Sequence, residues 1–174
     1  REMNREVLGV DIGGVIIDRV NDNTDTSFFG NNYLRTTAVP DAFGVLGHLA
    51  AGRFAGNLHL VSKCGQKVQD KSVDWLRFHR FFELTGIPSN HLHFCRERHE
   101  KKGICDQLGI THFVDDRLEV LSYLIDGVRT PPMCYLFRPQ DREVQKFQRF
   151  LPSVCVVQEW KEIEKAFGLK GEKQ

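Results

Sequence analysis

The stretch that decides the fold is VLGVDIGGVII, residues 7–17, in which an apolar run of strand length meets Asp11 and then two glycines. A continuous apolar run of this kind predicts a strand buried on both faces, as in the centre of a parallel sheet. Asp11 would lie at the carboxyl end of that strand, where open α/β sheets bind ligands. Gly13 and Gly14 would let the backbone turn sharply and approach a ligand closely.

The remaining chain alternates between apolar segments of strand length and segments with helical periodicity. After the first strand we expect strands at 58–62, 92–95, 110–114, 133–137 and 154–157, and helices at 40–51, 66–84, 100–108, 118–125, 141–150 and 160–167. In the helix at 66–84, the residues expected to face the sheet are Val68, Trp75, Phe78 and Phe82. This alternation predicts a three-layer, Rossmann-like α/β domain with a mostly parallel sheet of five or six strands.

The bulk composition fits one α/β domain spanning residues 1–174, with no internal repeat or domain boundary. Apolar residues make up 41% and charged residues 27%, both ordinary for a globular protein in water. The formal net charge of +1 gives no electrostatic case for nucleic acid or an anionic membrane as a partner. No apolar run reaches transmembrane length.

Five cysteines are scattered along the chain without a CxxC pair. Those inside apolar segments, where a reduced cysteine acts as a small hydrophobe, are Cys95, Cys105, Cys134 and Cys155. The pattern favours a reducing, cytoplasmic setting over a disulfide framework. Cys64 lies near Ser62, but no base partner for a catalytic thiol is indicated, so we interpret it as a neighbour of the site.

Polar side chains end three of the expected strands, and two lysines begin the helix before the fourth strand. In a parallel sheet they would converge at one edge; they are Asp11, Ser62, Lys101, Lys102, Asp115 and Asp116. Carboxylates and backbone carbonyls suit Mg²⁺, a hard ion that often shares its site with a substrate phosphate. A hydroxyl and an ammonium suit phosphoryl oxygens. A positioned carboxylate can also act as a nucleophile and form an aspartyl-phosphate.

These residues resemble, in order, the four motifs of the haloacid dehalogenase superfamily, whose members are mostly phosphatases. The resemblance covers residues 7–168. Asp11-Ile12-Gly13-Gly14-Val15 is similar to the first motif and Leu60-Val61-Ser62 to the second. Lys101, with Lys102 as the alternative, is similar to the third motif, and the segment at 112–117 to the acidic fourth motif. The C-terminal segment at 160–163 and the fourth motif are loosely similar to the 5'-nucleotidase-like branch.

The resemblance implies a set of functional residues. Asp11 and Lys101 would be catalytic. The phosphoryl group would be held by Ser62, Lys63, Lys101 and Lys102. Mg²⁺ would be bound by Asp11, the backbone carbonyl of Gly13, Asp115 and Asp116. Glu119 would support these ligands without binding the ion itself.

One position departs from the family pattern. The phosphatases usually carry a second Asp two residues after the nucleophile, which protonates the leaving group and then activates water. Here that position is Gly13, so general acid–base catalysis, worth about 10² to 10⁴ in rate, is missing from its usual place. Three interpretations follow. The chain is a Mg²⁺-dependent phosphatase that acts on a good leaving group or takes an acid from the loop or from the substrate. Alternatively it is a slow or vestigial enzyme, or a non-catalytic phosphate-binding or protein-interaction module.

Residues 18–39 form a polar segment longer than an ordinary connection, which we interpret as a minimal cap or flap loop. Its aromatic residues Phe28, Phe29 and Tyr33 either tuck the loop onto the body or face a substrate. By the family pattern, the segment between Ser62 and Lys101 leaves no room for a cap domain. The expected partner is a phosphorylated small molecule or macromolecule.

Three histidines lie near a cysteine, in the group His91, His93, His99 and Cys95. Their spacing matches no standard zinc ribbon or finger, so we expect solvated or strand-edge histidines.

Overall fold

The sheet is parallel throughout the part of the chain that the structure describes. The computed structural model describes residues 5–19, 28 and 30–168. Six strands form one sheet in the order β3-β2-β1-β4-β5-β6, and every neighbouring pair is parallel. They are β1 (Leu8–Val10), β2 (Leu58–Lys63), β3 (Leu92–Cys95), β4 (His112–Asp115), β5 (Met133–Phe137) and β6 (Cys155–Val157). The predicted Rossmann-like fold is confirmed.

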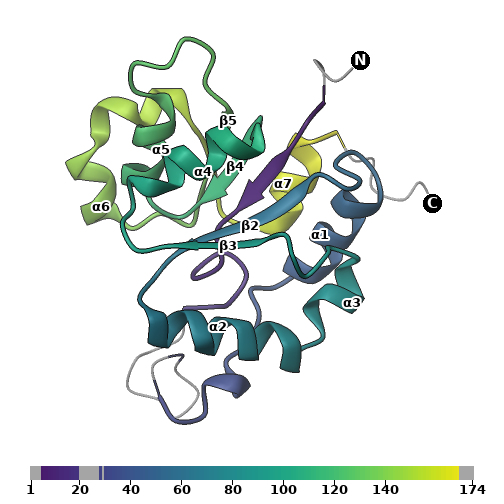
Figure 1. The fold of residues 1–174 in the computed structure, drawn as a ribbon. Helices are drawn as coiled ribbons and strands as arrows, with labels where there is room; N and C mark the ends of the chain where they lie inside the picture. Colours follow the sequence, from purple (N-terminus) through teal and green to yellow (C-terminus); the bar gives the residue numbers. More distant parts are fainter. Residues whose placement is uncertain (1–4, 20–27, 29, 169–174) are drawn as a thin grey trace.

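Helices cover both faces of this sheet (Figure 1). One face carries α1 (Ala42–Ala51), α2 (Gln66–Phe78), α3 (Phe81–Thr85) and α7 (Trp160–Ala166). The other face carries α4 (Glu100–Leu108), α5 (Leu118–Ile125) and α6 (Asp141–Lys146). Two short 3₁₀ helices, η2 (Tyr33–Arg35) and η3 (Gln148–Ser153), lie in the connections. These are the three layers that the alternating pattern predicts.

The first strand is buried on both faces, as its apolar run predicts. Leu8 and Val10 belong to the core cluster beneath α1, α2 and α7. Gly9 points to the other face, where an added Cβ would lie 2.5 Å from a ring carbon of Phe113. Only a glycine therefore lets Phe113 of β4 pack against β1 at this point.

The order of the strands places a switch point beside β1. From β1 the chain proceeds outward to β2 and β3, then returns to place β4 on the other side of β1 and proceeds outward again to β5 and β6. Open parallel sheets bind ligands in the crevice outside the carboxyl ends of the strands at such a reversal. The fold thus points to the ends of β1 and β4, where Asp11 and Asp115 lie.

Two predicted helices are wrong in extent. The expected helix at 66–84 is broken, because Arg80 adopts a left-handed conformation with φ of 55° between α2 and α3. As a result Phe78, expected to face the sheet, ends α2 with 61% of its surface exposed. The helix expected at 141–150 ends at Lys146 and continues as the 3₁₀ helix η3. Periodicity does not reveal such breaks.

The segment at 30–39 lies against α2. The indole N–H of Trp75 donates to the Thr36 carbonyl at 2.9 Å, and the Tyr33 hydroxyl donates to Asp74 at 2.9 Å. Phe28 contacts Tyr33 edge-on and packs against the core. These contacts fit the interpretation in which the aromatic residues tuck the loop onto the body. Phe29 and residues 20–27 lie outside the described residues, and the flap role stays a prediction.

The cysteines are all free thiols. Cys64, Cys95, Cys105 and Cys134 are buried, but Cys155 is exposed, because β6 is an edge strand with only Val157 buried.

Within the described ranges, no helix is long and apolar enough to cross a membrane.

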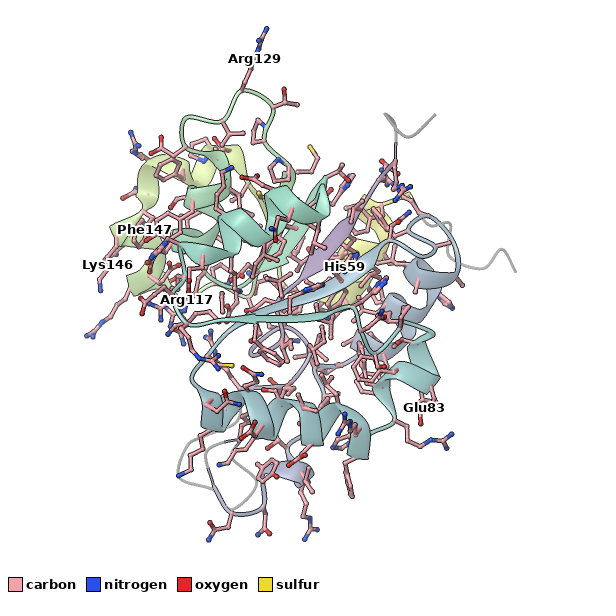
Figure 2. All side chains as sticks on the ribbon, viewed as in Figure 1. His59, Glu83, Arg117, Arg129, Lys146 and Phe147 are labelled. Atoms are coloured by element: carbon pink, nitrogen blue, oxygen red, sulfur yellow. The ribbon has the colours of Figure 1, made fainter. Side chains whose placement is uncertain are left out.

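Histidines on β2, on β3 and directly before β3 form a cluster toward the end of the sheet opposite to Arg117 (Figure 2). His59 Nδ1 lies 3.0 Å from His93 Nε2, and the His59 ring stacks on His91 at 4.0 Å between centroids. Burial, followed by the neighbouring His91 and His93, lowers the pKa of His59 to about 4, and burial also lowers the pKa of His93. His99 is not part of the cluster and lies edge-on to Tyr123.

This cluster should make the fold sensitive to acid. The unfolded chain takes up protons on these histidines below about pH 6.5, whereas folded His59 resists protonation down to about pH 4, so its contribution to stability is lost as the pH falls through this window. We expect His59→Gln to lose less stability than wild type between pH 7.5 and pH 5 in urea unfolding. His48→Gln, which changes a 63% exposed side chain on α1, is the control. An identical pH dependence in wild type and His59→Gln would contradict the prediction.

Candidate active site

The carboxyl ends of β1 and β4 bring three carboxylates together. The backbone N–H of Asp11 donates to the Val114 carbonyl at 2.9 Å, which extends the ladder between the two strands. One carboxylate oxygen from each of Asp11, Asp115 and Asp116 lies within 4.8 Å of the others, and all three residues are buried. Within the described ranges, this is the sole group of three or more His, Cys, Asp or Glu side chains that could hold a metal ion.

A buried lysine joins this group from α4. Lys101 Nζ donates to Asp11 Oδ1 at 3.0 Å and to Asp115 Oδ2 at 2.7 Å, and the residue is only 2% exposed. An isolated ammonium at this depth would lose most of its hydration energy, so it is stable there because both carboxylates pair with it. Lys101 therefore links the end of β1 to the end of β4.

Burial and crowding alter the proton affinities of these groups. Burial, followed by the charge of Asp11, raises the pKa of Asp115 to about 6 against the opposing effect of Lys101. The same two causes hold the pKa of Asp116 well above its usual range. Burial alone would lower the pKa of Lys101, but Asp11 and Asp115 outweigh it, and the net direction is upward. Fully ionised, the three carboxylates would carry more negative charge than Lys101 balances.

Arg19 supplies a second cation to the cluster. Its guanidinium pairs with Asp116 Oδ2. Gly14 lies directly beside this pair: it has a φ of +79°, and a Cβ there would collide with Asp116 Oδ2. Gly14 is therefore required both by its backbone conformation and by the approach of Asp116.

The predicted phosphate-binding residues fall into two sets. Ser62 and Lys63, at the end of β2, line the same cavity as Asp11 and Lys101. Lys102 lies outside that cavity and pairs with Asp106 on the same helix at 2.6 Å. Of the two candidate lysines, only Lys101 reaches the acidic cluster.

The helix after the acidic pair is capped from a distant part of the chain. Asp115 Oδ1 accepts the backbone N–H of Arg117 at 3.0 Å. The next two N–H groups, of Leu118 and Glu119, donate to the two carboxylate oxygens of Glu143 on α6 at 2.8 and 2.7 Å. Glu143 therefore fixes the start of α5 and with it the segment that carries the acidic pair.

A cavity of about 690 Å³ opens at this edge of the sheet. Besides the residues already described, its wall includes Asp18, Phe28, Cys64, Val68, Arg98, Arg117 and Gln140. Phe28 thus both packs against the body and lines the cavity, so the two interpretations of its role are compatible. Glu119, expected to assist the metal site, is absent from this wall; it accepts the Tyr123 hydroxyl at 2.8 Å and pairs with Arg98 at 3.7 Å.

Sequence reasoning missed three of these groups. Asp18 and Arg19 follow the apolar run directly, and their charge after a glycine turn was the available signal. Glu143 gave no signal, because its bonds to α5 span 24 and 25 residues.

Comparison with solved structures identifies the fold. The chain resembles a HAD family hydrolase from Deinococcus radiodurans R1 with bound phosphate and sodium, at 13% identity over 94% of this chain and 95% of that chain, with a TM-score of 0.60. It also resembles a protein described as a haloacid dehalogenase-like hydrolase from Burkholderia xenovorans LB400, at 10% identity over 96% and 100% of the two chains, with a TM-score of 0.64. A D,D-heptose 1,7-bisphosphate phosphatase from Burkholderia thailandensis gives 14% identity over 95% and 99%, with a TM-score of 0.53.

No family model and no curated protein matches the sequence. The predicted haloacid dehalogenase-like fold is confirmed by the structural likeness. At these identities the likeness establishes the fold, and the roles of individual residues rest on the geometry above.

Removing the buried ammonium should destabilise the protein strongly. Lys101→Ala leaves Asp11 and Asp115 buried without their cation, and we expect the free energy of unfolding to fall by about 3 kcal/mol in urea titrations. Lys102→Ala, the matched control, breaks only a partly exposed pair one turn apart and should change it by less than about 0.5 kcal/mol. Equal effects of the two substitutions would contradict the assignment of Lys101 to the buried site.

Weakening the distant cap should loosen the start of α5. Glu143→Gln removes the charge and one of the two acceptors, so we expect a loss of about 1 kcal/mol and faster amide hydrogen exchange at Leu118 and Glu119. Asp141→Asn, an exposed acidic residue on the same helix, is the control. Unchanged exchange at these two amides would show that Glu143 does not fix the segment.

Proposed function

We propose that the protein is a Mg²⁺-dependent phosphatase that hydrolyses a phosphomonoester through an aspartyl-phosphate on Asp11. One observation carries the proposal: Asp11, Lys101, Asp115 and Asp116 meet in one cavity at the switch point of the sheet. A nucleophile, a buried cation and an acidic ion site in contact are the parts that phosphoryl transfer to a carboxylate needs.

The acidic cluster fits a hard divalent cation. Its carboxylate oxygens lie close enough to share one ion, and their charge is only partly balanced by Lys101 and Arg19. Asp11, Asp115, Asp116 and the carbonyl of Gly13 would hold Mg²⁺. When bound, the ion would supply positive charge next to the phosphoryl oxygens.

The protein's own side chains then divide the remaining work. Lys101 holds the Asp11 carboxylate through Oδ1 and so orients the nucleophile. Ser62, buried beside it, and Lys63 would bind oxygens of the phosphoryl group from the end of β2. The cavity volume lies within the range of about 300–1,000 Å³ that suits small molecules, which favours a small phosphorylated substrate over a macromolecule.

Gly13 favours a second candidate function. Without a carboxyl at this position the scaffold could bind phosphate or a partner protein without turning it over. Turnover itself distinguishes the two functions.

The test uses p-nitrophenyl phosphate, whose leaving group needs little protonation. We expect Mg²⁺-dependent turnover that Asp11→Asn abolishes, because the nucleophile is lost. Mg²⁺ binding is measured separately by calorimetry, where Asp116→Asn should weaken binding at least about tenfold. Asp106→Asn, which changes an exposed carboxylate outside the cavity, is the control. A folded chain that binds Mg²⁺ without turnover at any pH would overturn the phosphatase and support the binding module.

A further inference from the structure

The cavity contains a carboxyl group that the mechanism above does not use. Asp18 lies on its wall, five residues beyond Gly13. Among the described residues on that wall, the other carboxylates are Asp11, Asp115 and Asp116, which form the buried cluster. Asp18 is therefore the one carboxyl there that is free of both the nucleophile role and the proposed ion site.

The backbone holds Asp18 in a defined place. Its N–H donates to the Thr37 carbonyl at 2.9 Å, and the preceding Ile17 forms isolated bridges with Gly13 and Ala38. The side chain is 31% exposed, so it can exchange protons with solvent. Its charged neighbours are Arg138, which follows β5 and lies 3.9 Å away, and Arg19, the next residue in the chain, which pairs with Asp116.

Other proton-bearing groups on the wall are less suited to both steps of the reaction. Burial raises the pKa of the Cys64 thiol, so it keeps its proton and cannot act as a base near neutral pH. Lys101 is fully engaged with Asp11 and Asp115. Lys63 is already assigned to binding the phosphoryl oxygens in the proposed function.

We propose that Asp18 is the general acid and base of the reaction, in place of the carboxyl that Gly13 lacks; this inference rests on the proposed phosphatase function. In the first step Asp11 attacks phosphorus, the bond from phosphorus to the ester oxygen breaks, and that oxygen takes the proton of the Asp18 carboxyl and leaves as an alcohol. In the second step the Asp18 carboxylate takes a proton from water while the water oxygen bonds to phosphorus. The bond from phosphorus to Asp11 breaks, which releases inorganic phosphate, restores the Asp11 carboxylate and leaves Asp18 protonated.

The test compares two substrates of nearly the same shape with different leaving groups. Phenyl phosphate releases phenolate, a poor leaving group with a conjugate-acid pKa of about 10, whereas p-nitrophenyl phosphate releases a good one. Asp18→Asn should lower kcat/KM for phenyl phosphate at least about tenfold more than kcat/KM for p-nitrophenyl phosphate. A loss of the same factor for both substrates, or no loss, would overturn the proposal, since a purely structural role does not distinguish leaving groups.

Three further variants sharpen the result. Asp126→Asn, which removes an exposed carboxylate paired with Arg149 outside the cavity, should leave kcat/KM unchanged for both substrates. Arg138→Gln removes the cation beside Asp18 but keeps the carboxyl, so it should not reproduce the leaving-group effect. Gly13→Asp has room for its side chain, because an added Cβ meets nothing within 4 Å. Gly13→Asp should raise phenyl phosphate turnover more in the Asp18→Asn background than in wild type. An equal gain in both backgrounds would show that Asp18 does not transfer the proton in this reaction.

The two proposals fail separately. Loss of p-nitrophenyl phosphate turnover in Asp11→Asn supports the phosphatase whatever Asp18 does. A wild-type chain inactive on both substrates would overturn both proposals. Turnover of p-nitrophenyl phosphate with an unchanged substrate ratio in Asp18→Asn would overturn only the role of Asp18.

Discussion

The ammonium of Lys101 between Asp11 and Asp115 is the contact on which the active-site edge depends. Without it, two buried carboxylates from neighbouring strands would face each other at the point where β1 and β4 end. Even with it, and with Arg19 paired to Asp116, burial and the charge of Asp11 raise the pKa of Asp115 and Asp116. A phosphate dianion would add to this negative charge. The proposed phosphatase site would therefore need additional positive charge before it accepts such a substrate, and a divalent cation held by oxygens would supply it in the smallest volume.

The topology explains why these groups meet. Parallel strands end at one edge, and the reversal of strand order beside β1 coincides with the cavity there. Contacts from distant parts of the chain then fix the loops around the crevice. Trp160 on α7 donates to the Val15 carbonyl at 2.8 Å, and Glu143 on α6 caps the helix that follows Asp116. Precise placement of the charged groups thus depends on both helical layers as well as on the strands that carry them.

The sequence predicts those features that depend on local pattern. The apolar run around Val10 is buried on both faces because helices cover both sides of the sheet. The strand ends where the sequence turns from apolar to polar, at Asp11. Lys101 was predicted from its resemblance to the third family motif, with Lys102 as the alternative, because the two could not be separated without knowing which side of the helix faces β1. Features formed by contacts between distant segments leave no such pattern. The cap by Glu143, the pairing of Arg19 with Asp116 and the stacking of His59 on His91 all belong to this class. The break at Arg80 is missed for a different reason, since a single left-handed residue does not alter hydrophobic periodicity.

The position of the proton donor is less constrained than that of the other catalytic groups. Attack by Asp11 in line with the leaving group places that group on the far side of phosphorus, away from the strand that carries the nucleophile. In the proposed mechanism, the groups that hold the phosphoryl oxygens must match the fixed geometry of the phosphoryl group, and the candidates come from strand ends and a buried helix position. A proton donor has to come within hydrogen-bond reach of the departing oxygen, and more than one segment around a cavity can supply such a group. Gly13, which has open space beside it, and Asp18 both belong to the segment after β1. An acid at position 18 instead of position 13 therefore leaves the strand ends and Lys101 unchanged. The loss of a carboxyl at Gly13 is therefore a weaker argument against catalysis than the loss of Asp11 or Lys101 would be.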